Sequence, residues 1–247
     1  MPQSEIYNID CNIGMKKYPD KYFDLACVDP PYGINSPKMQ MGYAPNRNEK
    51  SQYPSKQKTK GRLNSGGGKL KNRILNQSDI DWDNEIPSPE YFKELFRVSK
   101  NQIIWGFNYF PLPPSRGIIC WDKIQPWDNF SQIELAWTSY DFPAKLFRLS
   151  NRGGRNEKRK IHPNEKPQEL YKFCYDTAGI KPGMKVLDTH LGSGNSRIVA
   201  QIMGFDFVGF ETNETYYKDS IEEYDKAIFG KEKVGKINII QSQLFNY

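Results

Sequence analysis

Four consecutive residues near the start of the chain, Asp29, Pro30, Pro31 and Tyr32, could hold an aromatic amine for reaction. The two prolines fix the backbone, so the Asp29 carboxylate and the Pro30 carbonyl can both accept hydrogen bonds from one NH₂ group. Tyr32 adds a flat face for an aromatic ring. Two fixed acceptors favour a pyramidal nitrogen and stabilise the positive charge that develops on it when it attacks a carbon electrophile. Taken alone, the four residues are better explained as a rigid turn.

A second group of residues, between 186 and 211, has the pattern of a strand, a glycine loop, a helix and a further strand. Gly192 and Gly194 allow the backbone to approach a ligand closely, because they have no side chain. The helix that follows presents free N–H groups and its positive end, which favour an anionic group such as a carboxylate. The further strand ends at Glu211, where an acid can bond the two hydroxyls of a ribose.

These features predict a ligand that contains a ribose and a carboxylate but no phosphate. The sequence has no G-x-x-x-x-G-K-[ST] motif, and Arg197 stands where a dinucleotide-binding G-x-G-x-x-G pattern has its last glycine. S-adenosylmethionine meets the description. The alternative is an ordinary turn between strand and helix, in which the glycines only permit close packing.

Both groups of residues must be held at the ends of strands, and the hydrophobic pattern predicts suitable elements. Strands are predicted at residues 6–10, 24–28, 102–105, 117–121, 133–138, 184–188 and 206–210. Helices are predicted from Ser88, over 167–177, through 198–202 and over 216–227. The alternation predicts an α/β fold with a mostly parallel sheet, which binds ligands at the carboxyl ends of its strands.

Much of the positive charge of this chain, whose net charge is +6, lies in two long polar segments at about residues 35–84 and 145–162. Clustered positive charge favours a polyanion such as nucleic acid, and solvated loops are the simpler alternative. We expect phosphate contacts from basic residues of both segments: Lys56, Lys58, Lys60, Arg62, Arg148, Arg152, Arg155, Lys158 and Arg159.

Composition excludes several other classes of protein. Cys11, Cys27, Cys120 and Cys174 are far apart in the sequence, so neither a disulfide framework nor a zinc site is expected, and no metal is predicted. No apolar run is long enough to cross a bilayer, and the first residues do not have the pattern of a signal peptide. A protein of the cytoplasm, without a membrane partner, is therefore expected.

Together the motifs resemble the DNA amino-methyltransferases, specifically the permuted (β) group in which the catalytic motif precedes the cofactor motif. The matching segments are NIDC (8–11), FDLACVDPPYG (23–33), IWGFNYF (104–110), HPNEKP (162–167), LDTHLGSG (187–194) and VGFE (208–211). The resemblance implies a Rossmann-like methyltransferase fold, dependent on S-adenosylmethionine, with a mostly parallel seven-stranded sheet and circularly permuted motif order. It also implies one methyltransferase domain over residues 1–247, with the two basic segments as DNA-binding loops.

The resemblance assigns catalysis to Asp29, Pro30, Pro31 and Tyr32. It assigns cofactor binding to Asp10, Cys11, Asp29, Lys166, Asp188, Thr189, His190, Gly192, Ser193, Gly194, Asn195, Ser196, Glu211 and Thr212. Three residues depart from the family pattern, since Thr189-His190 replaces Pro-Phe and Asn195 replaces Thr. An amide can still donate to a carboxylate, so cofactor binding should persist. His190 is better explained by loop packing than as a metal ligand or base.

In this family an acidic residue at the first position of the catalytic motif favours adenine N6, and serine favours cytosine N4. Asp29 therefore predicts methylation of adenine N6, on a base flipped out of duplex DNA. Cytosine-N4 methylation and a catalytically silent DNA-binding homologue are the main alternatives. Methylation of RNA or of a protein glutamine, and a Rossmann oxidoreductase, explain fewer of the motifs.

Three further expectations concern partners. The resemblance places the chain in DNA methylation and restriction-modification. Its short length leaves little room for a separate recognition domain, which favours a short target sequence or a homodimer. The tail from Gln241 to Phe245 resembles the peptide by which bacterial proteins bind the sliding clamp, although a final strand or a frayed end explains it better.

Overall fold

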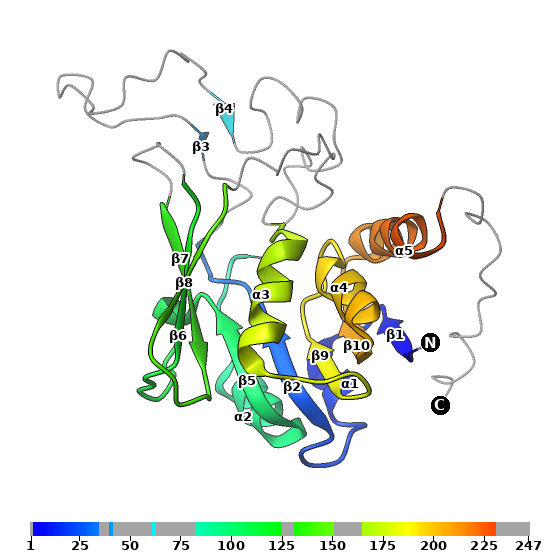
Figure 1. Cartoon of the computed structure of the whole chain (residues 1–247), viewed down its shortest axis with the longest axis horizontal. Helices are drawn as coiled ribbons and strands as arrows, with labels where there is room; N and C mark the ends of the chain where they lie inside the picture. The colour runs from blue at the N-terminus through cyan, green and yellow to red at the C-terminus, as the bar shows by residue number, and fades with distance from the viewer. Residues whose placement is uncertain are drawn as a thin grey trace.

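The computed structural model describes residues 2–34, 40–41, 61–62, 83–124, 131–150 and 165–230 (Figure 1). Its main feature is an eight-stranded sheet with the strand order β1-β10-β9-β2-β5-β7-β6-β8. The strands are β1 (Ser4–Tyr7), β2 (Phe23–Val28), β5 (Ser99–Trp105), β6 (Ile118–Asp122), β7 (Ile133–Thr138), β8 (Lys145–Arg148), β9 (Lys185–Asp188) and β10 (Asp206–Phe210).

Strand β7 is antiparallel to both of its neighbours, and every other pairing in this sheet is parallel. The predicted α/β fold with a mostly parallel sheet is therefore confirmed. The sheet has eight strands, however, where the resemblance implied seven. The sequence analysis placed residues 145–148 in a basic loop, but they pair with β6 as strand β8 at the edge of the sheet. A separate antiparallel pair, β3 (Gln40–Met41) and β4 (Gly61–Arg62), lies in the first basic segment.

Five α-helices and one 3₁₀ turn accompany the sheet in the described part of the chain. They are α1 (Cys11–Met15), α2 (Pro89–Val98), η3 (Phe107–Tyr109), α3 (Gln168–Ala178), α4 (Asn195–Met203) and α5 (Glu214–Phe229). The predicted start of α2 is confirmed, because the Ser88 side chain caps it by accepting from the Tyr91 N–H. Strand β1 ends before Asp10, where the sequence predicted a strand, because the Asp10 carboxylate caps α1 by accepting from the Asn12 N–H.

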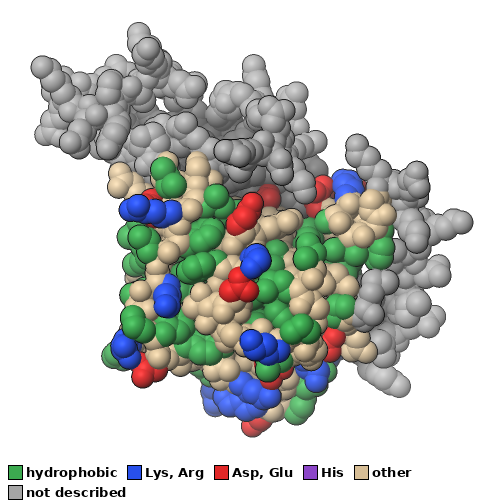
Figure 2. All heavy atoms as spheres, in the orientation of Figure 1, with side chains coloured by type: hydrophobic (Ala, Val, Ile, Leu, Met, Phe, Trp, Pro, Cys, Tyr) green, Lys and Arg blue, Asp and Glu red, His purple; other side chains and the backbone are tan. Residues whose placement is uncertain are grey.

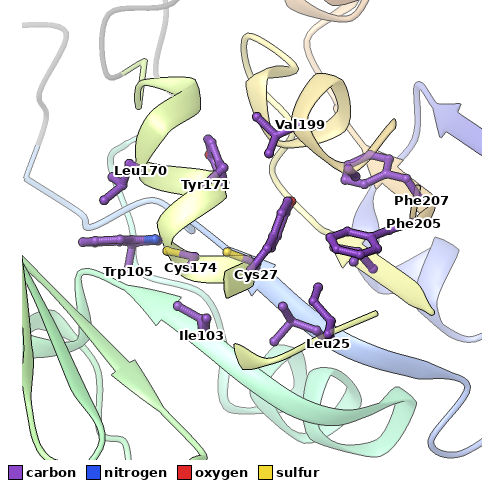
Figure 3. Packing of buried hydrophobic residues seen from close by; sticks show 14 of the residues in the cluster. Leu25, Cys27, Ile103, Trp105, Leu170, Tyr171, Cys174, Val199, Phe205 and Phe207 are labelled. Carbon is purple, nitrogen blue, oxygen red and sulfur yellow. The ribbon is translucent and has the colours of Figure 1, made fainter. Parts of the chain in front are cut away.

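The helices cover both faces of the sheet, and alternate residues of central strands such as β2 supply the two cores. In β2, Leu25 and Cys27 pack with α3 and α4, whereas Ala26 and Val28 pack with α1 and α2. Figure 3 shows Cys27 pointing toward Cys174 of α3 within the first of these cores. Strands buried on both faces explain the continuous apolar runs that made β2 and β9 predictable from the sequence. No helix among the described residues is long and apolar enough to cross a membrane.

The topology brings the polar residues that follow several strands together at one end of the sheet. The carboxyl ends of β1, β2, β5, β9 and β10 meet there, because these strands are parallel. Strand β7 runs in the opposite direction, so its first residues, Ile133 and Glu134, lie at this same edge. The end of β6 lies beside them, since Trp121 pairs with Glu134.

Candidate active site

The turn after β2 is held by an aspartate that is distant in the sequence. Asp83 Oδ1 accepts hydrogen bonds from the backbone N–H groups of Tyr32 (2.7 Å) and Gly33 (3.0 Å), and Asp83 is 1% exposed. Gly33 has a φ of +69°, which a residue with a side chain rarely adopts. Asp83 thus fixes the turn that carries Asp29. No pattern in the sequence points to this role, because Asp83 lies in a polar segment without periodicity.

Tyr32 is held by contacts on its ring and on its hydroxyl. The hydroxyl donates to Asp29 Oδ1 at 2.5 Å, and the ring stacks on Tyr109 with centroids 5.0 Å apart. Gly106 makes this position possible, since an added Cβ would lie 2.1 Å from the Tyr32 ring. The sequence analysis expected Tyr32 to offer a face to a base. In this structure Tyr109 covers one of the two faces of the ring.

Four charged side chains form a chain of ion pairs beside this turn. Lys166 pairs with Asp29 Oδ2 and, at 3.1 Å, with Glu134 Oε2, and it donates to the Tyr32 hydroxyl at 3.2 Å. Lys123 pairs with the other carboxylate oxygen of Glu134. The Lys166 side chain is only 3% exposed. Lys166 was predicted to bind the cofactor, but its ammonium pairs with the two carboxylates. Glu134 and Lys123 were not predicted as site residues.

The electrostatics of this cluster favour the charged forms of Lys166 and Glu134. Burial works against the Lys166 ammonium, but Asp29 and Glu134 raise the pKa of Lys166 above its ordinary value. Burial would likewise raise the pKa of Glu134, but the ammonium groups of Lys166 and Lys123 hold it at about 2. Burial and the nearby Glu134 raise the pKa of Asp29, against the opposing effect of Lys166.

The glycine loop and Glu211 are joined by hydrogen bonds. Glu211 accepts from the Gly192 N–H with one carboxylate oxygen and from the Asn213 N–H with the other, both at 2.9 Å. Burial raises the pKa of Glu211, although these N–H groups oppose the shift. The Glu211 carboxylate is therefore fixed in orientation directly beside the loop, as the sequence pattern predicted.

Other predicted residues lie behind the loop and support it. Asp188 accepts from the Ser196 hydroxyl (2.6 Å) and from the His190 N–H (3.1 Å), and burial raises the pKa of Asp188 to about 7. The Asn195 amide donates to Glu165 (3.0 Å) and to the Lys166 carbonyl (2.9 Å). The expectation that Asn195 could donate to a cofactor carboxylate does not fit this arrangement, because both amide hydrogens are used within the protein.

The departure Thr189-His190 forms a small hydrogen-bonded group with α2. The Thr189 hydroxyl lies 2.7 Å from the Tyr91 hydroxyl and 2.9 Å from His190 Nδ1. The His190 ring also contacts Tyr91 edge-on, with centroids 5.4 Å apart. Burial lowers the pKa of His190 to about 4, so the imidazole is neutral at physiological pH. These contacts hold His190 in the loop.

One cavity of about 300 Å³ brings most of the predicted residues together. The predicted residues in its wall are Asp10, Cys11, Asp29, Pro30, Pro31, Tyr32, Lys166, Thr189, His190, Gly192, Ser193, Glu211 and Thr212. Asp188, Gly194, Asn195 and Ser196 are not part of the wall. Residues that sequence reasoning missed also line the cavity, including Asp83, Tyr91, Glu165 and Tyr171. The cavity thus extends from the turn after β2 to Glu211.

The predicted DNA-binding residues mostly lie outside the described part of the chain, as does the tail from Gln241 to Phe245. Two of them are described: Arg62 lies in β4 and Arg148 lies at the end of β8. The Arg148 side chain is exposed, and its Nε pairs with Asp122 at 3.1 Å. On the face that Figure 2 shows, the described lysine and arginine side chains are scattered among acidic and apolar groups. The described residues contain no cluster of side chains that could hold a metal ion.

Comparisons with known proteins agree with this geometry. The sequence profile of a family described as DNA methylase matches residues 71–223. The Type II methyltransferase M2.DpnII of Streptococcus pneumoniae is 25% identical over 146 residues, 59% of this chain and 49% of that protein. M2.LlaDCHI of Lactococcus lactis subsp. cremoris, also a Type II methyltransferase, is 24% identical over 155 residues, 63% of this chain and 52% of that protein. The chain thus aligns with about half the length of these curated relatives.

A solved structure extends the likeness to almost the whole chain. The cytosine-N4-specific PvuII DNA methyltransferase has a TM-score of 0.51 and 13% identity, and the match covers 93% of this chain and 95% of that one. At this identity the likeness establishes the fold. The sequence profile covers more than half of the chain, and this chain therefore belongs to the DNA methylase family, the amino-methyltransferases of DNA that depend on S-adenosylmethionine.

Proposed function

We propose that this chain transfers a methyl group from S-adenosylmethionine to the exocyclic amine of a base flipped out of duplex DNA, with adenine N6 as the target. One observation carries the proposal. A single cavity has the Asp29 turn at one end and the glycine loop with Glu211 at the other. The names of the relatives, Type II methyltransferases, support the same role and a place in a restriction-modification system.

The lining of the cavity fits this cofactor. Glu211 is oriented by two backbone N–H groups, and each carboxylate oxygen keeps acceptor capacity for a ribose hydroxyl. Gly192 and Ser193 also line the cavity and lead into α4, whose N-cap Gly194 has no side chain to cap the helix, so the positive end of the helix can favour a carboxylate in the cavity. Asp10 lies in the same wall and is proposed to contact the adenine. When bound, S-adenosylmethionine supplies a methyl group activated by a sulfonium sulfur.

Residues of the chain would prepare the amine. The Asp29 carboxylate and the Pro30 carbonyl would accept its two hydrogens, aim the nitrogen lone pair and stabilise the charge that develops on nitrogen. Asp29 is suited to this role because its orientation is fixed before substrate arrives. Tyr32 holds one carboxylate oxygen and Lys166 holds the other. Positioning should supply much of the remaining rate enhancement, with the reacting atoms held about 3–3.5 Å apart.

Duplex DNA is proposed as the partner. Basic residues of the segments around 47–73 and 145–160 would contact phosphates, and Arg148 at the end of β8 is one of them with a described, exposed side chain. Asp29 favours adenine N6, since the family resemblance links an acid at this position to adenine. Cytosine N4 would use the same geometry, and it is the second outcome of the test below. The homodimer and the sliding-clamp contact remain predictions.

The test is transfer of labelled methyl from S-adenosylmethionine to unmethylated duplex DNA, with mass analysis of the nucleosides. The wild type should produce N6-methyladenine. Asp29→Asn keeps the shape of the side chain but removes its charge, so kcat should fall about a hundredfold. Asp141→Asn changes an exposed aspartate that pairs with Arg116, and it should behave as wild type.

Binding separates the proposed roles. In calorimetry, Asp29→Asn should bind S-adenosylmethionine as wild type does, whereas Glu211→Gln should bind it at least about tenfold more weakly, because an amide presents only one acceptor oxygen to the ribose. N4-methylcytosine as product would keep the mechanism and change the target. Cofactor binding without product from any DNA would refute the proposed activity and favour a silent DNA-binding homologue.

A further inference from the structure

The Lys166 ammonium lies between two carboxylates in a nearly closed environment. Its nitrogen lies within ion-pair or hydrogen-bond distance of three oxygen atoms, which belong to Asp29, Glu134 and Tyr32. The cation also lies 5.3 Å from the centre of the Trp105 ring. A buried cation that loses its partner is strongly destabilised, so Lys166 requires at least one carboxylate at every stage of a reaction.

One carboxylate oxygen of Glu134 can accept a further hydrogen bond. Its Oε2 is buried, and no group of the described chain donates a hydrogen bond of good geometry to it. Its contact with Lys166 is an ion pair at 3.1 Å, whereas the Lys166–Asp29 pair is shorter. The other oxygen of Glu134 is held by Lys123. Glu134 is not part of the cavity wall, whereas Lys166 is, so Glu134 would affect the reacting atoms through Lys166.

We propose that Glu134 is a positioning residue that takes over the Lys166 ammonium when Asp29 engages the substrate amine. This inference rests on the proposed function. In the free protein, Lys166 and the Tyr32 hydroxyl occupy the two oxygens of Asp29. An incoming NH₂ group must share one of these oxygens. A small shift of Lys166 that turns its 3.1 Å ion pair with Glu134 Oε2 into a hydrogen bond releases Asp29 and keeps a carboxylate beside the buried cation.

The balance of charge in the reaction leads to the same role. The amine nitrogen forms the new bond to carbon with its lone pair, and the electrons of the carbon–sulfur bond pass to sulfur. The nitrogen then loses one proton, and the N–H electrons return to nitrogen. Asp29 is the carboxylate placed to receive that proton. Once Asp29 is neutral, Glu134 is the counter-ion that remains for Lys166, and Lys123 balances Glu134 while Asp29 is charged.

The pKa of Asp29, which a titration would measure, depends on the titratable groups around it. Those that act on it, or that its charge acts on, come from several elements: Lys166, Glu134, Tyr32, Cys27, Tyr91, Tyr171 and Asp188. Burial raises the pKa of each phenol well above its ordinary value, so the phenols stay neutral. The charges that govern Asp29 are therefore Lys166, Glu134 and, near neutral pH, Asp188.

The experiment is a ¹³C NMR titration of side-chain carboxyl groups in the full chain, without cofactor or DNA. Asp29→Asn identifies the Asp29 signal. In Glu134→Gln the Asp29 midpoint should fall by about one pH unit, because a like charge is lost and Lys166 pairs with Asp29 alone. In Lys166→Met it should rise by a similar amount. Glu94→Gln, which removes a carboxylate paired with Arg97 on α2, should leave it unchanged.

Kinetics supply a second readout. Glu134→Gln should lower kcat at least about tenfold and leave the Kd for S-adenosylmethionine within about twofold of wild type. Glu134→Asp keeps the charge, so it should restore both the wild-type midpoint and most of kcat. If Glu134→Gln does not fold, Lys123→Met tests the same chain of ion pairs. In that variant Glu134 has lost its Lys123 partner, so it should attract Lys166 away from Asp29 and raise the Asp29 midpoint.

An Asp29 midpoint in Glu134→Gln that equals the midpoint in Glu94→Gln would overturn the inference. So would midpoints that move in the same direction in Glu134→Gln and Lys166→Met, because a merely structural disturbance has no reason to reverse its sign. The titration does not depend on methyl transfer. Opposite shifts in a protein that methylates no DNA would support the ion-pair chain and refute the proposed function.

Discussion

Gly106→Ala adds a single methyl group next to Tyr32 in the candidate active site. We expect it to destabilise the protein in two ways, by straining the backbone at Gly106 and by displacing the Tyr32 ring. Gly106 has a φ of +73°, and an added Cβ would lie 2.1 Å from Tyr32 Cε1. Carbon atoms in contact normally lie about 3.5–4.0 Å apart, so the Tyr32 ring must move by roughly 1.5 Å in Gly106→Ala. That movement would pull the Tyr32 hydroxyl away from Asp29 and Lys166.

The cost has two parts. The left-handed backbone costs an alanine about 1–2 kcal/mol. Displacing Tyr32 weakens two hydrogen bonds that involve charged groups, each worth about 1.5–3 kcal/mol. We therefore expect Gly106→Ala to lower the free energy of unfolding by about 3–5 kcal/mol. For a chain of this size, that corresponds to a fall in Tm of roughly 10 °C.

Gly179 provides the matched control. It has a φ of +66° at the end of α3, and an added Cβ would meet no atom within 4 Å. Gly179→Ala should therefore lower stability by only about 1–2 kcal/mol, a fall in Tm of roughly 3–6 °C, and leave methyl transfer unchanged. Gly106→Ala should also lower kcat at least about tenfold, since Asp29 loses the hydroxyl that orients it.

A double-mutant cycle with Tyr32→Ala tests the assigned cause. Once the ring is removed, the Gly106→Ala change should cost only the backbone term, as at Gly179. The two changes should thus be non-additive by about 2–3 kcal/mol, measured by urea unfolding. Equal destabilisation by Gly106→Ala in the presence and absence of the Tyr32 ring would show that the added methyl group does not clash with Tyr32.

Three further predictions concern the loop and the turn. Asp83→Ala removes both bonds that hold the turn after β2 and should lower the free energy of unfolding by about 2–4 kcal/mol in urea, with a smaller loss for Asp83→Asn, which keeps an acceptor oxygen. Burial raises the pKa of Asp188 from 3.8 to about 7, so its stabilising effect is complete below about pH 4 and is lost as the pH rises to 7. In denaturation measured across this range, Asp188→Asn should lack that part of the wild-type slope; an unchanged slope would show that Asp188 is not the group responsible. The pKa of His190 is about 4, so the ratio of S-adenosylmethionine Kd values for wild type and His190→Phe should stay constant from about pH 5.5 to 8. A ratio that changes near the ordinary histidine pKa of 6.5 would contradict the burial of this ring.

The sequence predicted the elements whose local pattern agrees with their place in the fold. Strand β10 and the start of α2 are examples, because an apolar run between polar residues and a serine cap are both local signals. Strand β8 was missed for the opposite reason. Its residues, Lys145 to Arg148, are half charged and lie at an edge, so nothing in their own sequence distinguishes them from a basic loop.

The candidate site also contains residues that local sequence patterns predicted and residues that they did not. Asp29, Gly192 and Glu211 belong to motifs with fixed spacing, and they lie around one cavity as predicted. Asp83 and Glu134 belong to no motif, and their roles depend on contacts with residues far away in the chain: Tyr32 for Asp83, and Lys166 for Glu134. No local pattern encodes such pairs. Asn195 shows a subtler limit, since its residue type suits a ligand but the fold uses both of its hydrogens.

The antiparallel direction of β7 explains why a second carboxylate, Glu134, lies at the same end of the sheet as Asp29. If β7 were parallel to β5, Glu134 near its start would lie at the amino end of the sheet, away from Asp29. Because β7 is antiparallel, Glu134 lies beside Trp121 near the end of β6, and Lys123 follows directly on that strand. A buried Lys166 on Asp29 alone would either neutralise the carboxylate or hold it too tightly for an amine to compete. The antiparallel strand supplies Glu134, and the end of β6 supplies Lys123; on the proposed role of Glu134, this extra ion pair lets Lys166 stay buried while Asp29 remains available.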